Sequence, residues 1–108
     1  MNFNNGFRGG FGGGNLQQLM KQAQKMQQDM ERAKEEIANT EFVGSAGGGM
    51  VEVKMTGQRK VVSVSIKQEV VDPDDKEMLE DLVLASVNEA LEKITKMENE
   101  KLPNVPGM

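Results

Sequence analysis

The chain has 108 residues, of which 28% are charged and 37% hydrophobic, and its net charge is −4. This size and balance predict one folded domain. It contains no cysteine and no histidine, which excludes disulfides, thiolate nucleophiles, imidazole bases and zinc sites built on these residues. No apolar run is long enough for a membrane span and no secretory signal is visible, so we expect a cytoplasmic location and no membrane partner.

Residues 1–14 form a segment with six glycines and three asparagines. Such a composition buries too little surface to offset the entropy of ordering, so we predict a disordered arm. Three phenylalanines and Arg8 lie within it, and segments that interleave arginine with aromatic residues bind nucleic acid by stacking and charge. A plain flexible arm is the other interpretation, because one arginine supplies little charge.

A long helix is predicted from Leu16, with Asn15 as its N-cap. No glycine or proline interrupts the chain from Asn15 to Asn39. Apolar residues recur at alternating spacings of three and four, which is a heptad pattern: Leu16, Leu19, Ala23, Met26, Met30, Ala33 and Ile37. This narrow stripe needs a partner, either the second helix or the same helix of another subunit.

Three short strands are predicted. The first lies at residues 40–45, around Phe42 and Val43, and the other two at residues 50–56 and 61–66, where apolar and polar residues alternate. A glycine-rich turn at 46–49 joins the first two strands. Gly57 and Gln58 predict a two-residue type II′ hairpin turn between the second and the third. Connections this short allow only an antiparallel meander. In the third strand, one face carries the apolar residues, which are Val62, Val64 and Ile66.

A second helix is predicted after Asp72, which can act as the N-cap, with Pro73 in the first helical position. We interpret the surrounding acidic residues as capping groups rather than a metal site, because the EF-hand spacing is missing. The apolar face of this helix comprises Leu79, Leu82, Val83, Ser86, Ala90, Leu91 and Ile94. The helix is expected to end near Lys101, and residues 102–108 to form a frayed tail.

The predicted fold class is therefore α+β: a long N-terminal helix, a three-stranded antiparallel meander and a C-terminal helix. These elements form a single domain over residues 15–101. Only two helices are available to cover the two faces of the sheet, and the long first helix overhangs it, so an apolar stripe and an open sheet edge remain uncovered. Both features predict self-association.

Several segments of this domain, in this order and spacing, resemble the YbaB/EbfC family of bacterial nucleoid-associated proteins. The segments are Gly47 to Val53, Gly57, Val62 to Ile66, Leu79 to Ala85 and Val87 to Leu91. The resemblance implies a tweezer-like homodimer whose helical arms project from a joined central sheet. It also implies binding of double-stranded DNA with modest sequence preference, and a role in nucleoid organisation or gene expression.

Three basic surfaces are candidates for DNA contact, and each also has a plain structural interpretation. The first lies on the outer face of the long helix, which could be an ordinary solvated face: Lys21, Lys25 and Arg32. The second lies towards the end of the C-terminal helix, where lysines also favour the helix dipole: Lys93, Lys96 and Lys101. The third is the hairpin, where basic residues also protect sheet edges: Arg59 and Lys60, with Lys54 and Lys67 nearby.

Phosphate-led DNA binding by a dimer is the leading hypothesis for function, with a location in the nucleoid. The alternative is a protein-interaction module that uses the heptad helix and the acidic surface without contacting DNA. An enzyme is not expected, because no arrangement of residues typical of catalysis is present. For the same reason we expect no cofactor and no small-molecule substrate.

Overall fold

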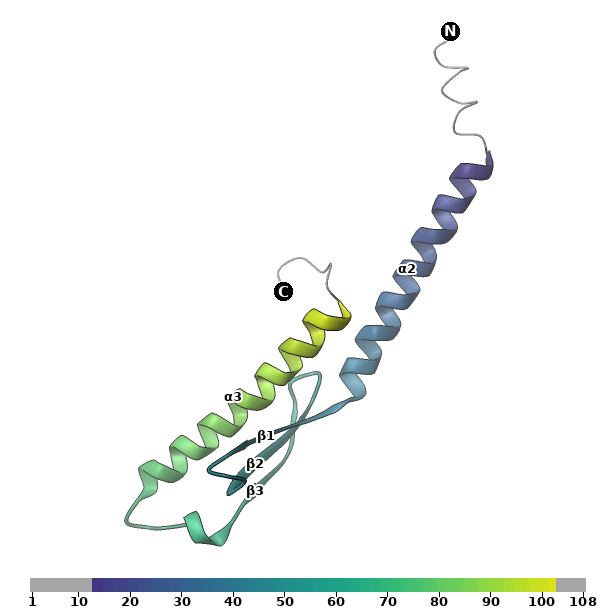
Figure 1. Cartoon of the computed structure of the whole chain (residues 1–108). Coiled ribbons are helices and arrows are strands. Elements are labelled where there is room, and N and C mark those ends of the chain that lie inside the picture. The colour runs from purple at the N-terminus through teal and green to yellow at the C-terminus, as the bar shows by residue number, and fades with distance from the viewer. Residues whose placement is uncertain (1–12, 103–108) are drawn as a thin grey trace. The chain divides into compact units, whose positions relative to one another are not determined.

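A computed structural model of the chain describes residues 13–102 and is shown in Figure 1. Its elements follow the predicted order of helix, three strands and helix, so the α+β fold class is confirmed. Their bounds are α2 at Gly13–Asn39, β1 at Glu41–Ala46, β2 at Val51–Thr56, β3 at Val61–Ile66, a short 3₁₀ helix at Gln68–Val70 and α3 at Lys76–Lys101. The predicted arm falls outside the described residues over positions 1–12, and so does most of the predicted tail.

Two compact units divide the chain, one ending at Arg32 and the other beginning at Ala33. In the first unit, the described residues form one helical stretch, and the side chains from Asn15 to Asp29 are all exposed. The predicted N-cap at Asn15 is wrong, because the helix begins at Gly13. The first N–H groups of a helix need no intrahelical acceptor, so the glycine segment can continue the helical backbone past the expected cap.

In the second unit, the strands form an antiparallel sheet in the order β1-β2-β3. Helix α3 packs on the face of β1 and β2, as Figure 1 shows. The centre of this core contains Val53 and Met55 of β2 against Ala90 and Ile94 of α3, all at most 1% exposed. Close approach of α3 requires Gly44, because a Cβ atom there would overlap the carbonyl oxygen of Ser86.

The β2–β3 hairpin differs from the predicted type II′ turn. The Thr56 N–H donates to the carbonyl oxygen of Lys60, and the Arg59 N–H donates to that of Thr56, both at 2.9 Å. These bonds define a three-residue loop in which Arg59 has the left-handed conformation, with φ of 64°. Gly57 is needed for space instead of a special turn geometry, since a Cβ atom there would overlap the carbonyl oxygen of Ile37.

Helix α3 begins later than predicted. Asp75 is its N-cap, and its side chain accepts a hydrogen bond from the Met78 N–H at 3.2 Å. Asp72, the predicted cap, instead accepts from the Asp74 N–H at 2.9 Å, a local turn bond that competes with helix capping. The helix ends at Lys101 as predicted, but Leu102 is only 5% exposed and is therefore not part of a frayed tail.

The apolar residues of β3 are largely exposed within residues 13–102. Val64 and Ile66 pair with the buried Val53 and Val51, so they share the face on which α3 lies, yet they are 50% and 39% exposed. The reason is width: a helix about 10 Å across covers about two strands spaced about 4.8 Å apart. Helix α3 therefore leaves this face of β3 exposed within the described residues.

Candidate nucleic-acid interface

The first predicted basic surface lies on the helical stretch of the first unit. Lys21 and Lys25 are exposed, and no acidic residue occurs from position 13 to position 28. At about 100° of rotation per residue, these two lysines and Arg32 lie within about 40° of one another, opposite the leucine and methionine stripe. This stretch therefore carries a cationic face and an apolar face on opposite sides.

Carboxylates hold these three cations weakly or not at all. Arg32 lies 3.6 Å from an oxygen of Asp29, but both side chains are more than half exposed, and such pairs contribute little. Within the described chain, Lys21 and Lys25 form no ion pair. Their charges remain available to an external anion.

The hairpin surface is dominated by an internal pair. The guanidinium of Arg59 donates to both carboxylate oxygens of Glu98, at 3.0 and 2.8 Å, and also lies 3.4 Å from the Thr95 hydroxyl. The hydrogen bonds from Arg59 hold the pKa of Glu98 below its usual range, and those to Glu98 raise the pKa of Arg59. Arg59 thus ties the hairpin to α3, which leaves little of its charge for DNA.

Two of the three predicted lysines on α3 are also engaged within the second unit. The ammonium of Lys93 donates to the carbonyl oxygen of Val43 at 2.6 Å and lies 3.5 Å from Glu89. Glu89 in turn accepts a hydrogen bond from the Ser45 N–H at 3.0 Å. Lys101 pairs with Glu36 at 2.8 Å. These contacts hold α3 against the strand β1 and the end of α2.

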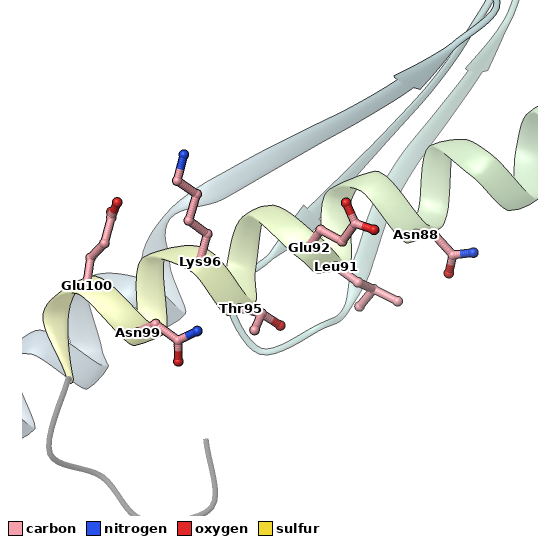
Figure 2. Close-up of a pocket in the computed structure, with 7 residues that line it drawn as sticks. All are labelled: Asn88, Leu91, Glu92, Thr95, Lys96, Asn99 and Glu100. Atoms are coloured by element: carbon pink, nitrogen blue, oxygen red, sulfur yellow. The ribbon is translucent and has the colours of Figure 1, made fainter.

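Lys60 and Lys96 have no ion-pair partner among residues 13–102. Figure 2 shows Lys96 and Glu100 extending from one side of α3, and Leu91, Thr95 and Asn99 from another. The hollow that they line has a volume of about 610 Å³ and is framed by α3 alone. Its acids and its single lysine offer mixed charge, so this hollow is a poor match for a polyanion.

The described part of the chain contains neither a cluster of metal-binding side chains nor a membrane-spanning helix. No group of three or more acidic side chains there could hold a metal ion. Within the same residues, no helix is both long and apolar enough to cross a membrane. The acidic residues near Asp72 and Asp75 act instead in the turn and the cap described above.

Sequence reasoning did not find the pair of Arg59 and Glu98. The two residues lie 39 positions apart, and no periodicity links a hairpin loop to a helix face. The left-handed conformation of Arg59, with φ of 64°, has no signal in the sequence, because glycine and asparagine are the usual residues at such positions. The structure brings Arg59 to α3, while Lys21, Lys25 and Arg32 belong to the other unit.

Comparisons with known proteins place these features in a family. Residues 12–108 match the model of the YbaB/EbfC DNA-binding family. A nucleoid-associated protein of Bacillus licheniformis is 53% identical over 79 residues, which cover 68% of this chain and 74% of that protein. A nucleoid-associated protein of Staphylococcus aureus is 55% identical over 73 residues, covering 62% of this chain and 70% of its own length.

A solved structure shares the fold. The crystal structure of an uncharacterized protein from Helicobacter pylori superimposes with a TM-score of 0.62 at 21% identity, covering 76% of this chain and 95% of that one. The family match extends over nearly all of the chain and over every described element. The chain therefore belongs to the YbaB/EbfC DNA-binding family.

Proposed function

We propose that this protein is a nucleoid-associated homodimer that binds double-stranded DNA through phosphate contacts made by Lys21 and Lys25. The observation that carries the proposal is the acid-free stretch from position 13 to position 28, with two exposed lysines that no described carboxylate neutralises. The whole chain is acidic, so attraction to DNA requires such a local concentration of cations.

Further DNA contacts are assigned by the same criterion, namely whether a carboxylate or carbonyl group within the chain already binds the cation. Arg32 extends the lysine stripe, and Lys60 and Lys96 are two of the cations of the second unit that form no ion pair within residues 13–102. Arg59, Lys93 and Lys101 are bound to carboxylates or a carbonyl group, so they contribute less to DNA binding. Glutamine is the abundant side chain near the lysine stripe that could read bases, so sequence preference is modest.

The homodimer forms through the uncovered face of β3. Val61, Val64 and Ile66 are 39% to 50% exposed on a strand whose outer edge is unpaired within residues 13–102. A second copy of the same strand and face would bury these side chains and satisfy the edge. Joined in this way, two sheets would carry two helical arms, which is the tweezer-like arrangement expected from the family.

The names of the relatives, which are nucleoid-associated proteins, support a cytoplasmic, nucleoid-associated location. The proposed role there is in nucleoid organisation or gene expression. The role is that of a binding protein and not of an enzyme, with no cofactor or small-molecule substrate. A protein-interaction module without DNA contact is the competing function, and the experiment below separates the two.

Gel shifts on two unrelated duplexes test the proposal. The variant Lys21→Ala with Lys25→Ala should weaken binding equally on both duplexes, because phosphate contacts carry no sequence information. The matched control is Lys54→Ala with Lys76→Ala, which removes the same charge from lysines whose side chains are 44% and 82% exposed, in long ion pairs of 3.9 and 3.8 Å. Equal losses in both variants would refute the assigned surface, and no binding by the wild type would favour the protein-interaction module.

A further inference from the structure

In the described part of the first unit, one carboxylate interrupts the cationic face. No acidic residue occurs from position 13 to position 28, and Asp29 is the first acid of the helix. At about 100° of rotation per residue, Asp29 lies about 40° around the helix axis from Lys25 and about 60° from Arg32. The three residues therefore form one ridge at spacings of four and three, in which the carboxylate lies between two cations.

The stability of the helix does not account for an aspartate at this position. The Asp29 carboxylate lies 3.6 Å from Arg32, but the two side chains are 55% and 76% exposed, and such pairs contribute little. Position 29 is an exposed place in the interior of a long helix, where aspartate has a lower helix propensity than the glutamine, lysine and glutamate around it. The helix dipole does not favour an acid this far from its N-terminus either.

We propose that Asp29 limits the affinity of this helical stretch for DNA, because its charge lowers the positive potential at Lys25 and Arg32. The inference rests on the proposed function, in which phosphates contact the cationic face. A phosphate bound at either cation lies within about one Debye length of the carboxylate, about 8 Å at physiological salt, so solvent ions do not screen the repulsion fully. Arg32 is affected most, since Asp29 pairs with it and not with Lys25.

The consequence is a contact that stops at the acid-free stretch. Lys21 and Lys25 engage phosphates, whereas Arg32 contributes little as long as the Asp29 carboxylate lies beside it. Differences in affinity among variants of one interface arise mostly from the rate of dissociation. Asp29 therefore keeps release from DNA fast, and firm binding depends on two copies of the helix acting together.

Charge-neutralising variants test this role. Asparagine is nearly the same size as aspartate and has a similar helix propensity, so Asp29→Asn removes little besides the charge. In fluorescence anisotropy titrations at physiological salt, this variant should bind an arbitrary duplex about three- to tenfold more tightly than the wild type. The matched control is Glu80→Gln, which removes an acid that is 60% exposed and lies 3.8 Å from Lys76 on α3. No gain in Asp29→Asn, or an equal gain in both variants, would overturn the proposal.

The salt dependence identifies the cation that gains a contact. If Asp29→Asn frees Arg32 to neutralise one phosphate in each copy of a dimer, the slope of the logarithm of the binding constant against that of salt should steepen by about 2. Asp29→Asn with Arg32→Ala should lose this steepening, and a slope as steep as in the single variant would overturn the assignment. Circular dichroism checks that the helix content is unchanged. If the wild type binds no duplex, the proposed function fails and this inference with it, whereas binding without a gain in Asp29→Asn overturns this inference alone.

Discussion

Arg59 and Glu98, which lie 39 residues apart, are joined by two hydrogen bonds of 2.8 and 3.0 Å. The Glu98 side chain is 15% exposed and that of Arg59 is 43% exposed, so solvent screens the pair on the arginine side. We expect Arg59→Ala to lower the free energy of unfolding by about 1 kcal/mol, measured by urea denaturation.

A glycine variant distinguishes the contribution of the Arg59–Glu98 pair to stability from that of the backbone conformation at position 59. Arg59→Gly also loses the pair, but glycine adopts a φ of 64° without a steric cost. It should therefore be more stable than Arg59→Ala by about 1 kcal/mol. Equal stabilities of the alanine and glycine variants would show that position 59 does not hold the left-handed conformation in solution.

The pair predicts a pH dependence of stability. Hydrogen bonds from Arg59 lower the pKa of Glu98 from its ordinary 4.5, so the pair stabilises the fold above the unfolded-state pKa. This contribution is lost as the pH falls through the lower folded-state pKa. The stability difference between the wild type and Glu98→Gln should be constant above about pH 5 and shrink below about pH 4 in denaturation series. A constant difference at every pH would contradict this.

Close packing at Gly44 predicts a large loss of stability in Gly44→Ala. The added Cβ would overlap the Ser86 carbonyl oxygen and lie 2.5 Å from the Ala90 nitrogen, so α3 must shift away from β1. We expect a loss of about 2–4 kcal/mol in thermal or urea unfolding. Gly48→Ala is the control: its Cβ meets nothing within 4 Å, and only its φ of 67° is strained, for a cost of about 1 kcal/mol.

Phosphate-led binding predicts a steep salt dependence. If Lys21, Lys25 and Lys96 each neutralise one phosphate, a dimer engages about six, and the logarithm of the binding constant should fall against the logarithm of salt with a slope of about −5. Titrations at several salt concentrations measure this slope. Lys21→Ala with Lys25→Ala should make it shallower by about 3 to 4. A slope near zero for the wild type would exclude phosphate-led binding.

The exposed apolar face of β3 predicts that substitutions on this face, and not on the opposite one, disrupt the dimer. Val64→Lys with Ile66→Lys should convert a species of twice the 11.9 kDa chain mass into a monomer in sedimentation. Ser63→Lys with Ser65→Lys adds the same charge to the same strand on the opposite face and should remain dimeric. Circular dichroism checks that both variants are folded. A dimeric Val64 and Ile66 variant would move the interface elsewhere.

Local sequence patterns predicted the elements of this fold well, because helices and strands depend on periodicity and on residues close in the chain. The strand from Val61 to Ile66 has the bounds expected from its alternation. The helix start was less certain, since Asp72 and Asp75 are both suitable caps and the choice depends on the turn around Pro73. The exposure of Val64 could not be predicted from alternation, because it depends on how many strands one helix covers.

The candidate site was less predictable than the fold for a physical reason. Charge counting treats Arg59, Lys93 and Lys21 alike, since each is a cation on a predicted surface. Their availability differs because long-range packing brings Glu98 to Arg59 and the β1 backbone to Lys93, whereas an acid-free helical stretch leaves Lys21 unpaired within the described chain. Of these three cases, only that of Lys21 can be predicted from residues close to it in the sequence.

The hydrogen bonds of Glu89 and Lys93 to the backbone of β1 close one edge of the sheet. A further strand could be added there only by displacing both side chains from Ser45 and Val43. No side chain in the described chain makes such bonds to β3. A sheet with one closed edge can pair with only one other sheet. When two copies pair about a two-fold axis, the open edge of each copy is occupied by the other. Fibre growth needs two open edges, so α3 limits this sheet to finite assemblies and protects it from edge-to-edge aggregation.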